Sequence, residues 1–305
     1  MNPLIKIFSL FFLLLAVYSN ARAASNHPAI AGWDAEKRKS FSKSYPLTDR
    51  SRVSIKNSFG NVNVSNWNKN EVKVDVTITV KATNEEIATA LLDAITIKES
   101  AGTNISFETS IESKNNNRRG KSSSMQIDYT VYLPSATNLK VVNSFGNTHV
   151  PDRTGNTELS QSYGNLTTGS LANTDRLSVE FGKLMAKELE NTKVFVKFSQ
   201  VDINRLSGNF DGNFQFCTKP SIGLTPTVQH VKIETKYSDL TLILPKTFDA
   251  QVDIVTNFGR LTNNSDLKLT DRDGGGLTET RYTNPSSRAN RRISIRSEFG
   301  KIQLK

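Results

Sequence analysis

The chain has 305 residues, with 39 Lys and Arg against 29 Asp and Glu, a formal charge of +10. Hydrophobic residues make up 36% and charged residues 22%, which predicts a folded protein rather than a disordered one. Three His and one Cys leave almost no material for a disulfide scaffold or a Cys/His metal site.

Residues 1–23 have the pattern of an export signal. Lys6 supplies a positive charge, residues 7–17 form an apolar run interrupted only by Ser9, and Ala21 and Ala23 stand at −3 and −1 of a cleavage site. This order predicts a cleaved signal peptide rather than an uncleaved anchor. The apolar run is shorter than the roughly 20 residues that cross a bilayer, and no later segment is apolar enough to be transmembrane.

Residues 24–38 are predicted to form a flexible leader, and residues 39–305 a single domain. After cleavage 37 basic and 29 acidic residues remain, a formal charge of +8. Cys217 lies far from the cleavage site and has no second cysteine to pair with, so we expect a buried, inert thiol. The mature protein is expected to be periplasmic, on the cell surface or secreted.

An internal repeat is the main signal in the sequence. Asn57-Ser58-Phe59-Gly60 returns at 143–146, and weaker copies of this turn follow at Tyr163-Gly164, Phe181-Gly182, Phe198-Ser199, Tyr237-Ser238, Phe258-Gly259 and Phe299-Gly300. The aromatic residues are 86, 18, 18, 17, 39, 21 and 41 residues apart. The steps of 39 and 41 each leave room for one degenerate copy, and residues 210–216 are the candidate in the first of them.

Residues alternate on both sides of each aromatic. The position four before it is aliphatic in all eight copies, and the position three after it in seven of them. The positions five before and two after it are polar throughout. This period of two predicts one short strand on each side of a fixed corner, with the aliphatic side chains inward.

These units predict an all-β fold, a β-solenoid (parallel β-helix-like) of 17–21-residue aromatic-Gly repeats. A single copy cannot bury its apolar face, whereas stacked copies share a continuous core. We expect the glycine to fit a corner that needs a positive φ, less strictly where Ser199 and Ser238 replace it. The alternative is a flat antiparallel sandwich, which rarely has such regular spacing.

The chain departs from the repeat twice. Residues 68–138 are predicted to form a small strand-helix-strand insert that caps one end of the stack, with strands near 72–80, 105–111 and 125–133 and a helix that begins after Asn84. Its polar segment 115–121 is expected to be an exposed loop. Residues 263–292 are expected to form a long surface loop before the last copy.

The aromatic-Gly corner between aliphatic strands, the helix-bearing insert, and the Leu-Pro pairs at 133–134 and 244–245 resemble the bacterial exported β-strand-repeat "putative adhesin" domain family. The resemblance covers about residues 41–305. It implies an exported, β-solenoid-like protein of bacterial envelopes and brings no catalytic residues with it.

No catalytic, cofactor-binding or metal site is predicted. A polysaccharide-active β-helix enzyme needs acids that converge on one face, but Asp239 is the only acid two positions after an aromatic. His27, His149 and His230 belong to separate regions without ligand spacing, and surface histidines are expected. Whether the segment 271–276 binds calcium is left open, because Asp271 and Asp273 precede three glycines but a later Glu is missing.

Two basic groups could meet an anionic polysaccharide, lipid headgroups or nucleic acid; they are Arg118, Arg119 and Lys121, and Arg288, Arg291 and Arg292. Export argues against nucleic acid, and solubilising loop charge is the simpler interpretation. The sequence therefore predicts a non-enzymatic adhesin-like binding or scaffold module of the cell envelope, with an envelope, polysaccharide or protein ligand and specificity in the loops 115–121 and 263–292. The alternative is a periplasmic structural or signalling-accessory protein.

Overall fold

The computed structural model describes residues 33–112, 123–273, 277–284 and 289–305. The predicted signal peptide, residues 24–32 of the predicted leader, His27 and the segment 115–121 lie outside the described residues. Residues 33–305 form one compact unit.

The unit is all-β, with 69% strand and 4% helix, as predicted. The described residues form 22 hydrogen-bonded strands and one helix. These are β1 (Ala35–Pro46), β2 (Arg52–Ser58), β3 (Val62–Asn66), β4 (Glu71–Ala82), α1 (Glu85–Asp93), β5 (Ile95–Ser100), β6 (Asn104–Ile111), β7 (Ser123–Leu133), β8 (Asn138–Ser144), β9 (Thr148–Val150), β10 (Thr157–Ser162), β11 (Asn165–Leu171), β12 (Thr174–Glu180), β13 (Lys183–Lys197), β14 (Gln200–Gln215), β15 (Thr218–Lys236), β16 (Leu240–Ile243), β17 (Gln251–Asn257), β18 (Arg260–Asn263), β19 (Thr270–Asp273), β20 (Glu279–Thr283), β21 (Arg292–Glu298) and β22 (Lys301–Leu304).

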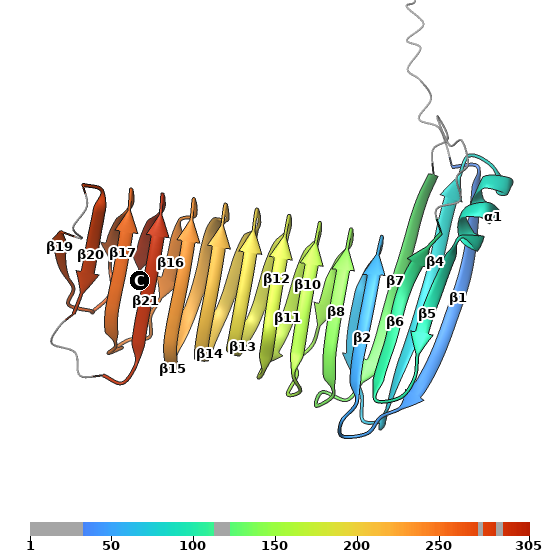
Figure 1. Ribbon diagram of the computed structural model, residues 1–305, viewed down its shortest axis with the longest axis horizontal. Coiled ribbons are helices and arrows are strands. Elements are labelled where there is room, and N and C mark those ends of the chain that lie inside the picture. The colour runs from blue at the N-terminus through green and yellow to red at the C-terminus, as the bar shows by residue number, and fades with distance from the viewer. Residues whose placement is uncertain (1–32, 113–122, 274–276, 285–288) are drawn as a thin grey trace, which may run out of the picture. The chain divides into compact units, whose positions relative to one another are not determined.

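The copies pair side by side in two parallel ladders (Figure 1). The first ladder runs through β2, β8, β10, β12, the second halves of β13, β14 and β15, then β21 and β17. The second ladder runs through β7, β3, β9, β11, the first halves of β13, β14 and β15, then β16, β22 and β18. The antiparallel sandwich is therefore excluded, because successive copies pair in parallel.

The register aligns equivalent positions of neighbouring copies. Leu159 lies opposite Val141 and Leu177, and Leu166 lies opposite Thr148 and Leu184. All eight side chains predicted inward four residues before the aromatic are buried, at 0–1% exposure. The predicted inward columns are confirmed except at Leu261, which is partly buried, and they form the core between the two ladders.

The predicted role of the corner glycine is wrong. The positive φ belongs to the aromatic residue, with values between 49° and 65° in all nine copies. The glycine is needed because of its neighbour instead: a Cβ on Gly146 would lie 1.9 Å from the carbonyl oxygen of Gly60, and one on Gly164 would lie 1.8 Å from that of Gly146. Adjacent glycine corners therefore pack backbone against backbone, and a side chain at Gly146 or Gly164 would collide with the preceding copy.

The expected degenerate copy in the first gap exists, since Phe216 has the same positive φ and occupies a corner between β14 and β15. The second gap holds no further copy among its described residues. Part of the predicted loop 263–292 is instead a hairpin of β19 and β20, and β20 pairs antiparallel with β17. The final copy, β21 and β22, lies between the copy of Tyr237 and that of Phe258.

The insert lies at the β2 and β3 end of the stack (Figure 1). There β4 pairs antiparallel with β1 and β7, and β5 pairs antiparallel with β6. The predicted helix is confirmed as α1, whose N-cap Asn84 accepts a 2.9 Å hydrogen bond from the backbone N–H of Ile87 through Oδ1. Strand β1 begins at Ala35, four residues inside the predicted leader.

Candidate functional site

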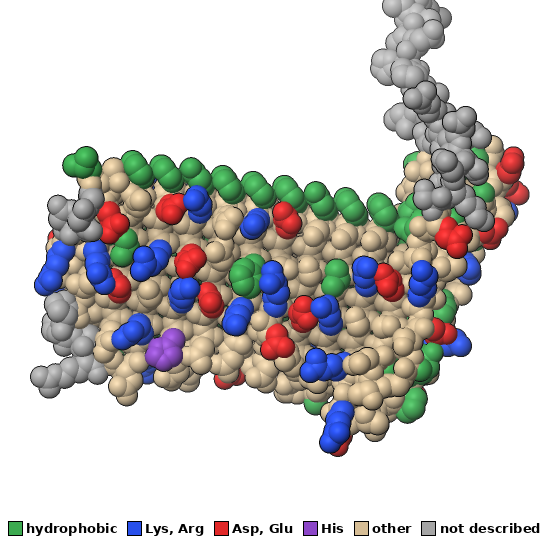
Figure 2. All heavy atoms as spheres, in the orientation of Figure 1, with side chains coloured by type: hydrophobic (Ala, Val, Ile, Leu, Met, Phe, Trp, Pro, Cys, Tyr) green, Lys and Arg blue, Asp and Glu red, His purple; other side chains and the backbone are tan. Residues whose placement is uncertain are grey.

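The most distinctive surface feature is a line of nine corner aromatics along one edge of the stack. We call it the aromatic row; in spatial order it comprises Phe59, Phe145, Tyr163, Phe181, Phe198, Phe216, Tyr237, Phe299 and Phe258. Neighbouring ring centroids are 4.8–5.1 Å apart and the ring planes are within 10° of parallel. Figure 2 shows the rings as a raised green line along the upper edge.

Each ring of the aromatic row is partly exposed, from 39% for Phe59 to 58% for Phe258. Because the faces are stacked on one another, inner rings present only their edges to solvent. Stacked aromatics of this kind stabilise each other beyond the area they bury. The row is thus both a structural element and a long apolar surface.

Two kinds of hydrogen bonding hold the corners beneath this row. In the copies of Phe59, Phe145 and Tyr163, which we call the amide corners, a buried Asn or Gln two residues before the aromatic donates to a neighbouring carbonyl. Asn143 Nδ2 donates to the Gly60 carbonyl at 3.1 Å. In the same corner, the Asn147 N–H donates to Asn61 Oδ1 at 2.9 Å. Buried carbonyls are thereby satisfied by side chains.

In the copies of Phe198, Phe216 and Tyr237, which we call the hydroxyl corners, Ser199, Cys217 and Ser238 replace the glycine. The Ser199 hydroxyl donates to the Lys197 carbonyl at 2.7 Å and accepts from the Gly182 N–H at 3.0 Å. The Gln200 N–H here donates to the backbone carbonyl of Gly182 at 3.0 Å, with no side chain involved. Burial raises the pKa of the Cys217 thiol, as expected of an inert cysteine.

A polar groove of about 410 Å³ lies on the outer face of the first ladder near its β17 end. We call it the C-terminal groove. Strands β14, β15, β21 and β17 supply its floor, and β20 contributes Glu279. The polar side chains that line it are Asn213, Gln215, Glu234, Lys236, Asn257, Glu279, Arg296 and Glu298.

Several groove side chains hold one another in place. Lys236 Nζ lies 2.7 Å from Glu298 Oε2, and this hydrogen bond raises the pKa of Lys236. Gln215 Nε2 donates to Asn213 Oδ1 at 3.0 Å. Amides, carboxylates and a guanidinium on a shallow surface can exchange hydrogen bonds with hydroxyl groups. The floor crosses several copies, so it offers a repeated set of such groups.

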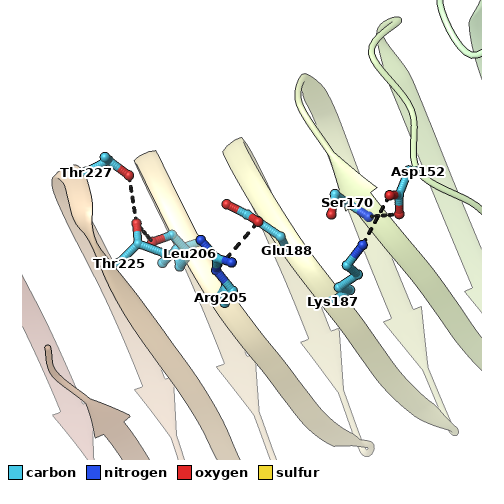
Figure 3. A network of polar contacts seen from close by, with 8 residues as sticks. All are labelled: Asp152, Ser170, Lys187, Glu188, Arg205, Leu206, Thr225 and Thr227. Carbon is cyan, nitrogen blue, oxygen red and sulfur yellow. Dashed lines mark hydrogen bonds and ion pairs between the residues drawn. The ribbon is translucent and has the colours of Figure 1, made fainter.

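The opposite edge of the stack carries a chain of polar contacts (Figure 3). Asp152 accepts from the Ser170 N–H at 2.8 Å, and its carboxylate lies 3.1 Å from Lys187 Nζ. These two contacts lower the pKa of Asp152. Arg205 Nε lies 3.6 Å from Glu188 farther along the same edge. These contacts link successive copies of the repeat along this edge.

Beside Asp152, the Arg153 side chain is buried, at 2% exposure. Its guanidinium donates to the carbonyls of Pro134 and Thr137, at 3.2 and 2.5 Å, and to Asn66 Oδ1 at 3.2 Å. Burial lowers its pKa. Carbonyl oxygens rather than a carboxylate accept from its two terminal nitrogens, whereas the buried Nε has no partner among the described residues. These bonds fasten the edge where the insert meets the first regular copies.

Among the described residues, which exclude Arg288, the structure does not bring the sequence-predicted site residues together. His149 on β9 and His230 on β15 are both exposed, and they belong to different ladders. Asp271 is exposed on β19, whereas 274–276 lie outside the described residues, so the question of calcium binding that the sequence leaves open is not tested there. Arg291 lies over the Phe248 ring at 5.6 Å, and Arg292 donates to Gln251 at 3.4 Å.

Within the described ranges, no three His, Cys, Asp or Glu side chains lie close enough to share a metal ion. The part of the chain that the structure describes contains no helix with the length and apolarity needed to span a membrane. Sequence reasoning missed both the aromatic row as a surface and the C-terminal groove. The aromatic row could have been predicted from the repeated aromatics, because equivalent positions of parallel copies lie side by side. The groove could not, because it depends on the hairpin of β19 and β20, for which the sequence has no clear pattern.

Comparison with known proteins gives structural likeness only. No family model and no curated protein matches the chain. A solved structure described as a putative cell adhesion protein from Clostridium sporogenes ATCC 15579 covers 88% of this chain and 99% of its own, at 15% identity and a TM-score of 0.23. A putative adhesin from Bacteroides fragilis NCTC 9343 covers 88% and 97%, at 11% identity and 0.38. A putative lipid binding protein from Parabacteroides distasonis ATCC 8503 covers 87% and 96%, at 13% identity and 0.38.

Proposed function

We propose that this protein is an exported, non-enzymatic β-solenoid that acts as an adhesin-like binding and scaffold module of the bacterial cell envelope. The parallel, in-register pairing of the copies supports the solenoid, because each copy adds one strand to each ladder. The pattern of residues 1–23 supports export. A rigid stack of this kind holds repeated surface groups at fixed spacing, which suits weak contacts made many times.

The observation that carries the binding role is the C-terminal groove. Its floor crosses four neighbouring strands, and Glu279 from the predicted 263–292 segment forms part of its wall. Three carboxylates, one guanidinium, one ammonium and three amides line it, a set that hydrogen-bonds hydroxyl groups. We assign it a hydroxyl-rich polymer, such as an envelope polysaccharide, that lies across the strands.

Binding is tested with the purified mature chain and a panel of envelope polysaccharides by isothermal titration calorimetry. Arg296→Gln and Glu279→Gln should each weaken binding several-fold without a change in melting temperature, since both side chains lie on the groove surface. Lys193→Gln removes one charge from the same ladder outside the groove and should leave binding unchanged. Equal losses for Arg296→Gln and Lys193→Gln, with no loss for Glu279→Gln, would attribute binding to overall positive charge and contradict the assignment.

Location is tested separately by protease treatment of intact cells that carry the protein with a C-terminal tag. Loss of the tag while a periplasmic control stays intact would support the adhesin role. Protection of the tag until the outer envelope is opened would favour the rival, a periplasmic structural or signalling-accessory protein. Crosslinking to envelope partners would then identify its neighbours.

A further inference from the structure

The aromatic row exposes a larger apolar area to solvent than a monomeric protein ordinarily does. Nine rings are each about half exposed, and an aromatic side chain has roughly 150–250 Å² of surface, so the row exposes on the order of 800 Å². The largest apolar patch of a typical monomer is about 300–600 Å² and is often functional. We propose that the aromatic row is a membrane-binding ridge that inserts into the interfacial layer of an anionic lipid surface. This goes beyond the envelope role proposed above and does not depend on the C-terminal groove.

The stacking of the rings argues against ligands that need a ring face. Sugar rings and cations bind over the face of an aromatic, and a cation must lie near the ring centroid. Seven of the nine rings have both faces covered by neighbours 4.8–5.1 Å away. These seven rings expose only their edges to solvent. The row is therefore suited to insertion into a lipid layer and not to stacking of a ligand on a ring face.

The same spacing disfavours a second copy of the chain as the occupant. Rings in contact leave no gaps into which the rings of another row could insert, so two rows would touch only edge to edge along a line. Stable protein interfaces bury about 800 Å² on each partner with close complementarity. A lipid layer needs no matching groove, because fluid acyl chains conform to a ridge one ring wide and about 39 Å long.

The composition of the row fits the boundary between headgroups and acyl chains. The row contains seven Phe and two Tyr, and the hydroxyls of Tyr163 and Tyr237 have no hydrogen-bond partner among residues 33–112, 123–273, 277–284 and 289–305. Rings with an apolar body and a polar tip are enriched at membrane interfaces. Phe and Tyr can therefore both insert at the membrane interface at any position of the ridge.

Charges beside the ridge match an anionic surface. The positions directly before the aromatics and two after them carry five bases and three acids, which are Lys183, Lys197, Lys236, Arg260 and Lys301 against Glu180, Asp239 and Glu298. Lys236 pairs with Glu298, whereas the other four bases form no ion pair with a described residue. Basic side chains next to buried aromatics strengthen binding to anionic lipids.

The experiment uses single-tryptophan forms of the full mature chain. Trp33 and Trp67 are replaced by Phe, and Phe198→Trp places the reporter in the middle of the row. Vesicles of phosphatidylglycerol and phosphatidylcholine, with and without brominated acyl chains, are then added. We expect a blue-shifted emission, at least twofold quenching by the brominated lipid, and weaker binding at high salt. The matched control keeps Trp67 and the native Phe198; its emission should change little.

A second set of variants keeps the test independent of the reporter. Phe181→Ser, Phe198→Ser and Phe216→Ser combined should lower partitioning to anionic vesicles at least tenfold. Because this change could also unfold the stack, Lys183→Gln with Lys301→Gln, on exposed or half-exposed side chains, should lower it several-fold while the melting temperature stays constant.

Three results would contradict the proposal that the aromatic row binds membranes. One is no binding to anionic vesicles at low salt. Another is binding in which Trp67 is quenched as strongly as the row reporter, which would place the contact elsewhere. The third is a blue shift that grows with protein concentration in the absence of lipid, which would show that a second copy covers the row. None of these affects polysaccharide binding or protease accessibility, so the two proposals fail separately.

Discussion

The amide corners and the hydroxyl corners solve the same packing problem in different ways. In the amide corners the buried side-chain amide donates to a carbonyl of the preceding strand pair, as Gln161 Nε2 does to the Gly146 carbonyl at 2.7 Å. In the hydroxyl corners the corner carbonyl accepts from a backbone N–H of the next copy, as Ser199 does from Thr218 at 3.1 Å. Both arrangements keep the aromatic row in register.

In the amide corners the hydrogen bonding accompanies a close approach at the glycine. Where the preceding carbonyl is bonded by an amide, it lies in the space that the next corner's Cβ would take, 1.8–1.9 Å away at Gly146 and Gly164. Where it bonds to the backbone, a serine or cysteine side chain fits at the corner. The amides do not account for every glycine, because a Cβ on Gly182 would also lie 1.9 Å from the Gly164 carbonyl oxygen, although Val179 stands two before that aromatic.

The largest effect is expected from Gly146→Val. Its Cβ would meet the backbone of Gly60, which cannot move without disturbing the neighbouring copy. We expect a loss of about 3 kcal/mol or more in the free energy of unfolding, measured by urea denaturation. Ser144→Val, on the outer face of the same strand, is the control and should change stability little. Unchanged stability of Gly146→Val would contradict the close-packing explanation.

Exchanging the residues two before the aromatic should harm both kinds of corner. Asn143→Val leaves the Gly60 carbonyl without its amide donor. Val196→Asn buries an amide at a position with 0% exposure, in a copy where the Gly182 carbonyl already accepts from the Gln200 N–H. Each change should cost about 1–3 kcal/mol of unfolding free energy. If Val196→Asn were neutral, the two corner types would be interchangeable and the comparison would fail.

A smaller loss is expected from Ser199→Ala. The change removes the hydroxyl that bridges the Lys197 carbonyl and the Gly182 N–H, and water cannot easily replace it at a residue 5% exposed. We expect about 1 kcal/mol in thermal or urea unfolding. Ser221→Ala, on the outer side of β15, should be close to neutral by the same assay.

Cys217→Ser should have the smallest effect, below about 0.5 kcal/mol, because serine already occupies the equivalent position in both neighbouring copies. Since burial raises the thiol pKa, Cys217 stays protonated near pH 8 and a thiol reagent should label it only in the unfolded chain. Rapid labelling of the folded protein would show that this corner opens readily.

The local part of this fold is readable from the sequence, and the order of its copies is not. Alternation around Phe145 or Tyr163 identifies the strands and the inward side chains, because burial repeats every second residue. The role of glycine was misassigned because a positive φ and a close approach both select Gly60 or Gly146. The 21-residue step from Tyr237 to Phe258 equals that of directly stacked copies, so nothing local reveals that another copy separates them.

That separation has a consequence for the order in which the molecule can be completed. A chain synthesised from its N-terminus presents the copy of Phe258 before residues 292–305 exist. The strands β15 and β17, which finally lie on either side of β21, are then available to each other or to a strand of another molecule. The β17 end of the stack therefore cannot adopt its final arrangement until residues 292–305 insert β21 between β15 and β17, even when the earlier copies have already folded.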